Sequence, residues 1–99
     1  DLKFMKGVVE KVKRGREFLR RELERLGLEV VPTQANFLMV NLKSWNTTAP
    51  ELCEKLSKKK IYIRDLSGFK GAGKDYVRIS VGRDEENAKL ISELEKLRG

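Results

Sequence analysis

Apolar residues recur at helical spacing in the first part of the chain. They are Val8, Val12, Leu19, Leu23 and Leu26, with charged residues between them. Because this spacing follows a helical period and Gly27 comes directly after the last position, the pattern predicts one long amphipathic helix. Gly15 interrupts the apolar row. Since an interior glycine costs stability relative to alanine, Gly15 indicates either a bend or a close backbone contact.

A second helix is predicted by the sequence Thr48-Ala49-Pro50-Glu51, which is a capping-box pattern. In such a box the threonine hydroxyl accepts a hydrogen bond from the glutamate amide, while the glutamate carboxylate accepts one from the threonine amide. The residues that this helix is expected to bury are Leu52, Cys53 and Leu56.

A third helix is predicted at the end of the chain, with Asp84 as its N-cap. Glu85 and Glu86 follow, and they place negative charge near the positive end of the helix dipole. The expected buried stripe consists of Ala88, Ile91, Leu94 and Leu97.

Four short apolar or alternating segments between these helices are predicted as strands. They cover residues 28–31, 37–42, 61–64 and 76–81. The last two segments are expected to pair as a hairpin around a glycine-rich loop. The prediction is therefore an α/β (α+β) domain in the order helix, two strands, helix, two strands, helix, with a largely antiparallel sheet covered by helices on one face.

The composition supports one soluble globular domain over residues 1–99. The chain is 39% hydrophobic and 37% charged, and its apolar runs are too short to cross a bilayer. The first residues show neither an initiator methionine nor a signal-peptide pattern, so we expect a fragment of a longer chain. Cys53 is the single cysteine and histidine is absent, which excludes disulfide frameworks, Cys/His metal sites and histidine acid-base catalysis within the chain. A reducing, cytoplasmic setting is expected.

Lysine and arginine outnumber aspartate and glutamate by 22 to 15, which gives a net charge of +7. Such an excess attracts anions, including nucleic acid, phosphate and carboxylate groups. However, the charges alternate in sign along most of the chain, which is typical of a solvated surface. Nucleic-acid binding is therefore kept as an alternative, although a face of purer sign with exposed aromatic residues would be expected for it.

Two arginines are the best candidates for a binding site. In residues 76–81, Val77, Ile79 and Val81 alternate and must face the core, so Arg78 points to the opposite side of the sheet. The same reasoning places Arg64 on the side away from the core. If the two strands are neighbours, both guanidinium groups lie on one sheet face.

Converging guanidinium groups repel each other unless an anion lies between them, and their shape suits carboxylate or phosphate oxygens. The predicted site is therefore an anion site formed by Arg64 and Arg78. The alternative is that each arginine pairs with a local acid, such as Asp65, or faces water.

The loop at residues 68–74 matches the glycine and lysine spacing of a phosphate-binding P-loop. Asp75 stands where that motif needs serine or threonine, and a strand is predicted where the motif needs a helix. A hairpin loop with permissive glycines is the better interpretation.

Five segments, taken in order, resemble the C-terminal part of the histidinol-phosphate type of aminotransferase. They are Arg14-Gly15-Arg16-Glu17-Phe18-Leu19, Leu26-Gly27-Leu28-Glu29-Val30, Pro32-Thr33-Gln34-Ala35-Asn36-Phe37, Ile63-Arg64-Asp65-Leu66 and Tyr76-Val77-Arg78-Ile79-Ser80-Val81-Gly82. The resemblance covers nearly the whole chain. It implies the small domain of a fold-type-I pyridoxal-phosphate enzyme, which closes over a cofactor held by a larger domain.

The resemblance also implies roles for both arginines. Arg78 occupies the position that binds the α-carboxylate of an amino-acid substrate, and Arg64 occupies the position that helps to hold a substrate phosphate. The expected partners are an amino-acid or amino-phosphate substrate, the large domain of the same chain, and a second copy in a homodimer. Nothing in the sequence resembles the region of the Schiff-base lysine, so no cofactor-binding or catalytic residue is expected within these 99 residues, and the piece alone is expected to be inactive.

Two further alternatives remain at this stage. Threonine-phosphate decarboxylase shares the implied fold, cofactor and anion sites. A stand-alone domain that binds a protein partner would lack the apolar surface for a large domain. The many glutamates and lysines favour a thermophilic source.

Overall fold

Helices and strands alternate along the chain nearly as predicted. The computed structural model describes residues 2–31, 33, 36–68 and 75–98, with side chains described from residue 10 onward. The elements are α1 (Leu2–Arg25), β1 (Glu29–Val31), β2 (Phe37–Asn41), the 3-10 turn η1 (Lys43–Trp45), α2 (Ala49–Ser57), β3 (Arg64–Asp65), β4 (Tyr76–Ser80) and α3 (Asp84–Arg98). No helix in this described part is long and apolar enough to cross a membrane.

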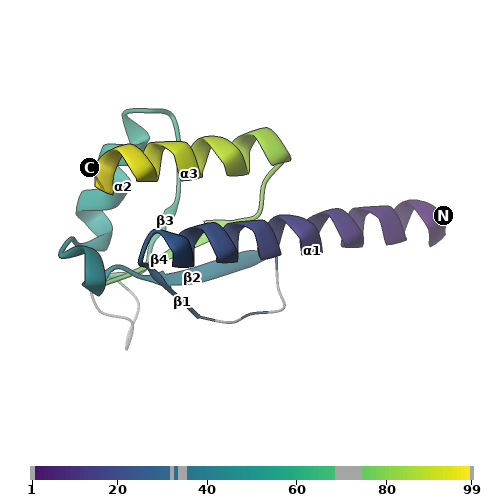
Figure 1. Cartoon of the computed structure of the whole chain (residues 1–99), viewed down its shortest axis with the longest axis horizontal. Coiled ribbons are helices and arrows are strands. Elements are labelled where there is room, and N and C mark those ends of the chain that lie inside the picture. Colours follow the sequence, from purple (N-terminus) through teal and green to yellow (C-terminus); the bar gives the residue numbers. More distant parts are fainter. Residues whose placement is uncertain (1, 32, 34–35, 69–74, 99) are drawn as a thin grey trace.

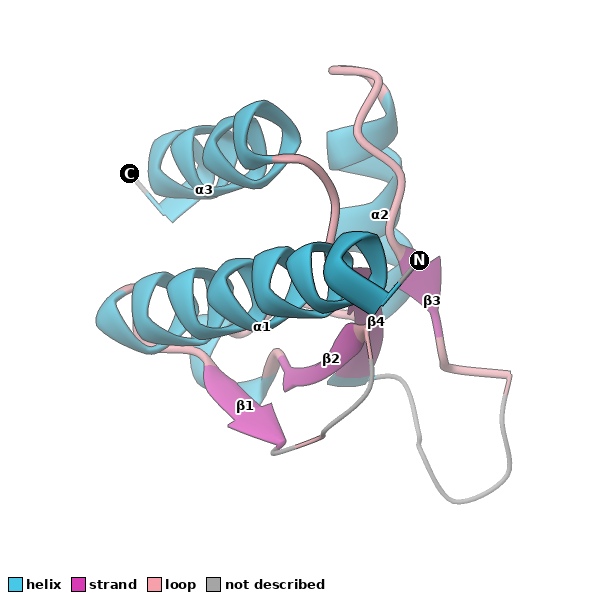
Figure 2. Cartoon of the chain, turned by 90° about the vertical axis from the view of Figure 1, so that its right-hand side faces the viewer, coloured by secondary structure: helices cyan, strands magenta, loops and turns pink. Residues whose placement is uncertain are grey.

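The four strands form one sheet in the order β1-β2-β4-β3, and every neighbouring pair is antiparallel. All three helices lie on the same side of this sheet, as Figures 1 and 2 show from two directions. The mixed fold with a one-sided cover of helices is therefore confirmed. β4 is a central strand although it is the last in sequence, so it joins β2 to β3.

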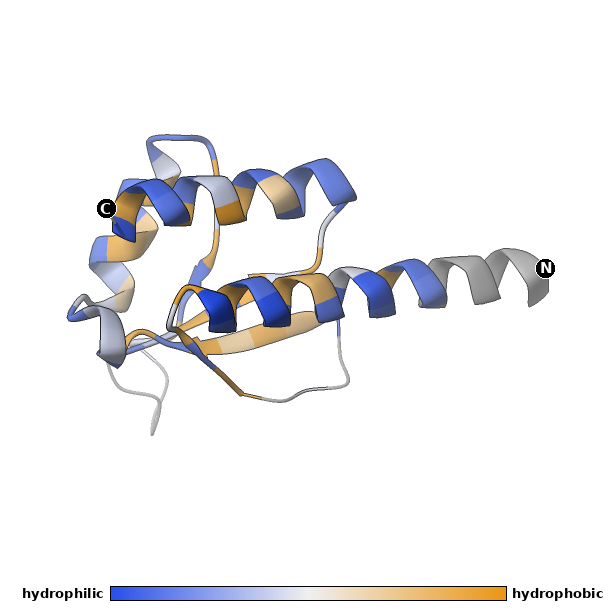
Figure 3. Cartoon of the chain, viewed as in Figure 1, coloured by the Kyte–Doolittle hydropathy of each residue, from blue (hydrophilic) through white to orange (hydrophobic). Residues whose placement is uncertain are grey.

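The core lies between the sheet and the helices. The sheet contributes Leu38, Val40, Val77 and Ile79, and α1 contributes Leu19 and Leu23. The apolar colouring in Figure 3 faces the interior on both α1 and α3. Burial of each such side chain stabilises the fold by roughly 1.5–3 kcal/mol. The helices therefore cover this face of the sheet, and the opposite face is left for other contacts.

Gly15 makes a close backbone contact, which was one of the two predicted possibilities. A Cβ atom added to Gly15 would lie 2.7 Å from Val81 Cγ1 and 3.2 Å from Asn87 Nδ2. Gly27, directly after α1, has a φ of 87°, a conformation that glycine adopts without strain. The glycine at 15 thus allows α1 to approach the segment between β4 and α3.

Of the two hydrogen bonds predicted for the capping box of α2, the first is confirmed. The Thr48 hydroxyl accepts a hydrogen bond from the Glu51 amide at 3.4 Å. The Glu51 carboxylate, by contrast, accepts from the Thr47 hydroxyl at 3.1 Å. Leu52 and Leu56 are buried as expected, whereas Cys53 is only half-buried.

The strand predicted at residues 61–64 is shorter and lies later, since β3 comprises only Arg64 and Asp65. The backbone before it is bound to α2 instead of to β4. The Ile61 amide donates to the Leu56 carbonyl at 3.0 Å, and the Cys53 thiol lies 3.6 Å from the Ile63 carbonyl. The alternation itself was predicted correctly, because Ile61 and Ile63 pack against the core.

The predicted cap of α3 and half of its predicted buried stripe were wrong. Asp84 is the first helical residue rather than the cap, and the backbone amide of the preceding Arg83 donates to the Glu86 carboxylate at 2.9 Å. The buried residues of α3 are Asn87, Leu90, Ile91 and Leu94. Ala88 is exposed and Leu97 is 42% exposed. Ile91 and Leu94 of the predicted stripe are thus confirmed as buried, whereas Asn87, and not Ala88, is held inside by hydrogen bonds that hydrophobic periodicity does not reveal.

Candidate functional site

The face of the sheet that the helices leave uncovered carries both predicted arginines. In the strand register, Val31 lies opposite Met39, Met39 opposite Arg78, and Arg78 opposite Arg64. These four residues form one row across all four strands, on the side opposite to the core residues Val40 and Val77. The sequence prediction that Arg64 and Arg78 share the non-core face is confirmed.

Arg64 and Arg78 are direct cross-strand partners in the antiparallel pair of β3 and β4. Side chains at directly opposed positions start about 4.5–5.5 Å apart at Cβ, and like charges there are destabilising. Arg64 is exposed and Arg78 is half-buried. The sheet therefore places two permanent positive charges side by side on its open face.

The surroundings of Arg78 orient its guanidinium group but leave one donor without an acceptor. Its Cζ atom lies 5.2 Å from the centroid of the Phe37 ring. Its Nε atom is buried and has no hydrogen-bond partner within the described part of the chain. A buried donor without an acceptor costs about 1–3 kcal/mol, so an anion that supplied one would be favoured.

The alternative that local acids neutralise Arg78 is not supported by the described residues. The Asp65 carboxylate accepts a hydrogen bond from the Ser67 amide at 2.8 Å, and Asp65 lies opposite Val77 in the register. Among the described residues no carboxylate forms a salt bridge with Arg78. The charge of Arg78 is thus available to an external ligand.

A second row of the same face consists of Glu29, Asn41 and Tyr76. The Asn41 amide nitrogen lies 3.4 Å from the Tyr76 hydroxyl, and the Asn41 side-chain oxygen accepts from the Lys43 amide at 2.9 Å. These contacts fix polar groups beside the arginine row. The open face therefore has a cationic centre beside the neutral polar residues Asn41 and Tyr76, with the acidic Glu29 on the edge strand β1.

The end of β4 is anchored by a buried polar residue that sequence reasoning missed. Asn87 is only 3% exposed. Its side chain accepts from the Gly82 amide at 2.9 Å and donates to the Gly82 carbonyl at 3.1 Å. In addition, the Val81 amide donates to the Asn36 carbonyl at 2.9 Å. These hydrogen bonds thus fix the backbone that directly follows Ser80, the last residue of the strand that carries Arg78.

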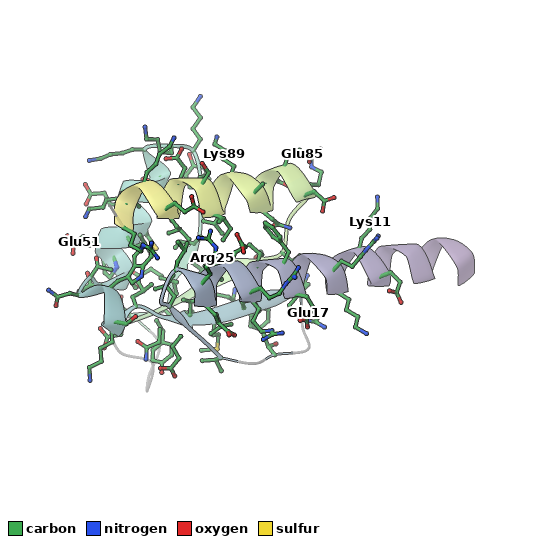
Figure 4. The ribbon with its side chains drawn as sticks, in the orientation of Figure 1. Lys11, Glu17, Arg25, Glu51, Glu85 and Lys89 are labelled. Atoms are coloured by element: carbon green, nitrogen blue, oxygen red, sulfur yellow. The ribbon has the colours of Figure 1, made fainter. Side chains whose placement is uncertain are left out.

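Two basic residues of α1, Arg20 and Arg25, form ion pairs with acids, which agrees with the solvated surface that the alternating charges predicted. Arg20 contacts Glu17 at 2.7 Å and Glu24 at 3.4 Å. Arg25 forms an ion pair with Glu95 and so connects α1 to α3, and Figure 4 shows Arg25 between these helices. The hydrogen bond from Arg20 lowers the pKa of Glu17 below its usual value. This arrangement describes a solvated helix surface.

Most of the glycine-rich loop lies outside the described residues. Of residues 68–74, only Gly68 lies within the described part of the chain. The element after the loop is the strand β4, as predicted, and a P-loop requires a helix at that point.

Comparisons with known proteins bear on the family and the fold of the chain. The family model described as aminotransferase class I and II matches residues 1–94. A histidinol-phosphate aminotransferase of Methanocaldococcus jannaschii is 36% identical over 98 residues, which cover 98% of this chain. The fold also matches two crystal structures. One is the histidinol-phosphate aminotransferase of Clostridium acetobutylicum, with a TM-score of 0.91 at 25% identity over 99% of the chain. The other is the L-threonine-O-3-phosphate decarboxylase of Porphyromonas gingivalis, with a TM-score of 0.81 at 36% identity over 89% of the chain.

The chain spans only 26% of the Methanocaldococcus protein, and 29% and 27% of the two crystallised chains. The family model's match, over residues 1–94, includes α1, all four strands and most of α3. The chain belongs to the class I and II aminotransferase family.

Proposed function

We propose that the chain is the substrate-binding small domain of a pyridoxal-phosphate-dependent aminotransferase that resembles histidinol-phosphate aminotransferase. In this proposal Arg78 binds the carboxylate of an amino-acid substrate, and Arg64 binds a substrate phosphate. The observation that carries the proposal is the opposed pair Arg64 and Arg78 on the open sheet face, with the buried Nε of Arg78 lacking an acceptor. A larger domain of the same chain and a second copy in a dimer complete the proposed enzyme.

The residues of the described sheet suit the anionic groups of a substrate better than the aldehyde of the cofactor. No strand position in this sheet is a lysine, so the amine that holds the cofactor would come from the larger domain. Pyridoxal phosphate, when bound there, supplies an electron sink for cleavage of a bond at the substrate Cα.

The role proposed for this chain is orientation. A guanidinium group binds a carboxylate through two parallel hydrogen bonds, which fixes both the position and the plane of the ligand. A second cation, Arg64, binds the phosphate of a phosphate-bearing substrate. Fixing an anionic group of the substrate restricts its rotational freedom before the reaction, and this lowers the entropic part of the barrier.

The test is substitution of Arg78 in the full-length enzyme that carries this sequence. Arg78→Ala should raise the KM for an amino-acid substrate and lower kcat/KM about a hundredfold or more, because breaking a desolvated charge pair costs roughly 3–5 kcal/mol. Arg78→Lys should also be impaired, since an ammonium group lacks the planar fork. Kinetics equal to those of the unmodified enzyme would overturn the assignment.

A decarboxylase of the threonine-phosphate type is the second candidate. It is favoured by the 36% identity and the TM-score of 0.81 to the Porphyromonas gingivalis enzyme. The two reactions differ in their products, because a decarboxylase releases carbon dioxide, whereas an aminotransferase passes the amino group to a keto acid. Product analysis with threonine phosphate and with histidinol phosphate therefore separates them.

Nucleic-acid binding stays a weaker alternative. Two of the basic residues on α1 that could contact nucleic acid, Arg20 and Arg25, are paired with glutamates. It predicts binding of single-stranded or duplex nucleic acid with a steep dependence on salt. If a titration with nucleic acid at low salt shows no binding, the nucleic-acid alternative is wrong.

A further inference from the structure

The described neighbour that orients the guanidinium group of Arg78 is an aromatic ring and not an acid. The Cζ atom of Arg78 lies 5.2 Å from the centroid of the Phe37 ring, which is within the range of a cation–π contact. Phe37 is half-buried, so the contact is partly shielded from water.

The strand register explains how the two side chains meet. Phe37 lies opposite Ser80, and Arg78 lies opposite Met39, so Phe37 and Arg78 are diagonal neighbours on one face of β2 and β4. Diagonal side chains begin about 7–8 Å apart, a gap that an aromatic or long side chain can span. The 5.2 Å contact therefore requires Arg78 to lean along the sheet toward Phe37.

An aromatic partner differs chemically from a carboxylate partner. A carboxylate would neutralise the guanidinium charge and occupy the N–H groups that a substrate needs. A ring face attracts the cation through its quadrupole and accepts none of the conventional in-plane hydrogen bonds. It therefore restricts the orientation of the guanidinium group while its charge and its donors remain available, which agrees with the absence of an acceptor at the buried Nε within the described residues.

We propose that Phe37 is a positioning residue that preorganises Arg78 for the carboxylate of the substrate. The inference rests on the proposed function, because it assigns the ligand of Arg78 to that carboxylate. If the ring holds the guanidinium group before binding, the substrate does not have to restrict this side chain itself, and the affinity for the carboxylate is higher.

The first experiment compares Phe37→Leu with the unmodified full-length enzyme. Phe37→Leu keeps an apolar side chain but removes the ring face. It should weaken binding of an amino-acid substrate about three- to tenfold, both as KM and as the equilibrium dissociation constant from calorimetry, with kcat changed less than KM. Binding of the matching amine, which lacks the carboxylate, should not change.

Two control variants separate positioning from packing. Phe37→Tyr keeps the ring face and should restore most of the affinity. Met39→Leu alters an apolar residue that lies directly opposite Arg78 on the same face but removes no ring, so it should leave the dissociation constant within about twofold. Equal losses for the amine and the amino acid, or equal losses in the Leu and Tyr variants of Phe37, would overturn the proposal.

If Phe37→Leu does not fold, phenylalanines with increasing numbers of ring fluorines at this position provide the same test. Fluorination lowers the negative potential of the ring face with little change in shape, so affinity for the carboxylate should fall stepwise with each fluorine. A series without any trend would contradict the inference.

Failure of this inference is distinguishable from failure of the proposed function. If Arg78→Lys is impaired but Phe37→Leu binds the amino acid normally, only the positioning role is wrong. If both variants bind normally, the carboxylate site itself is wrong. In the supported case, the loss caused by Phe37→Leu should be much smaller in the Arg78→Ala background than in the unmodified enzyme, because the ring acts through the arginine.

Discussion

Arg64 lies directly opposite Arg78 across the two strands at one edge of the sheet. Like charges at directly opposed positions of an antiparallel pair are unfavourable for strand pairing. The strands pair nevertheless, because the core residues on their other face, such as Val77 and Ile79, are buried. Burial of these core residues thus offsets the repulsion between the two guanidinium groups, and an anion bound on the open face would reduce that repulsion.

Arg64→Gln should affect phosphate-bearing substrates much more than phosphate-free amino acids. In the full-length enzyme we expect the KM for a phosphate-bearing substrate to rise about tenfold or more, since a charge-assisted contact is lost, while the KM for a phosphate-free amino acid stays within about twofold. Steady-state kinetics with the two substrates measure this difference. A similar rise for both substrates would contradict the assignment of the phosphate to Arg64.

Gly15→Ala should destabilise the fold although alanine is the better helix former. The helix gains about 1 kcal/mol from the substitution. The new Cβ, however, would lie 2.7 Å from Val81 Cγ1, and forced repacking of this kind costs about 1–3 kcal/mol. We therefore expect a net loss of about 1 kcal/mol in the free energy of unfolding, measured in urea. Gly68→Ala is the matched control, because a Cβ there meets nothing within 4 Å.

Asn87→Leu should lower the free energy of unfolding by about 2–3 kcal/mol. The substitution keeps the volume but removes the acceptor for the Gly82 amide and the donor to the Gly82 carbonyl. Thermal or urea unfolding measures the loss. The control is Ala88→Leu at the next, exposed position, where a change of no more than about 0.5 kcal/mol is expected. Equal effects at both positions would show that the hydrogen bonds to Gly82 contribute nothing.

The fold should lose stability in acid through two carboxylates. A hydrogen bond from Arg20 lowers the pKa of Glu17 below 4.5, and the Arg83 backbone amide lowers the pKa of Glu86 in the same direction. Because both pKa values are lower in the folded state, their contribution is fully present above about pH 5 and disappears as the pH falls through the folded values. Urea midpoints between about pH 5 and about pH 2 should therefore fall less steeply in a double variant, Glu17→Gln with Glu86→Gln.

The sequence predicts the helices well because most of the residues that each one buries are apolar and recur at helical spacing. It also predicts the faces of Arg64 and Arg78, since side-chain direction in a strand follows from simple alternation. Strand register is different. Phe37 and Arg78 are 41 positions apart in sequence, and only the pairing of Phe37 with Ser80 makes them neighbours. No local pattern reports such a pairing.

Asn87 shows the same limit for a helix. Hydrophobic periodicity assigns the buried stripe to apolar residues, so it does not place Asn87 among the buried ones. Its burial depends on two hydrogen bonds to Gly82, a residue outside the helix. The position of β3 was missed for a similar reason, because the Ile61 amide binds to the Leu56 carbonyl at the end of α2 and draws the chain away from β4.

The strand order β1-β2-β4-β3 also has a consequence for how the domain folds. β3 has no neighbour in the sheet until β4 is inserted between it and β2, and β4 is the last strand to leave the ribosome. A hairpin of β1 and β2 can form early, whereas the contacts of β4 with β2 close a much longer loop and form slowly. The docking of β4 on β2 then buries Val77 and Ile79, and it stabilises the strand that brings Arg78 opposite Arg64.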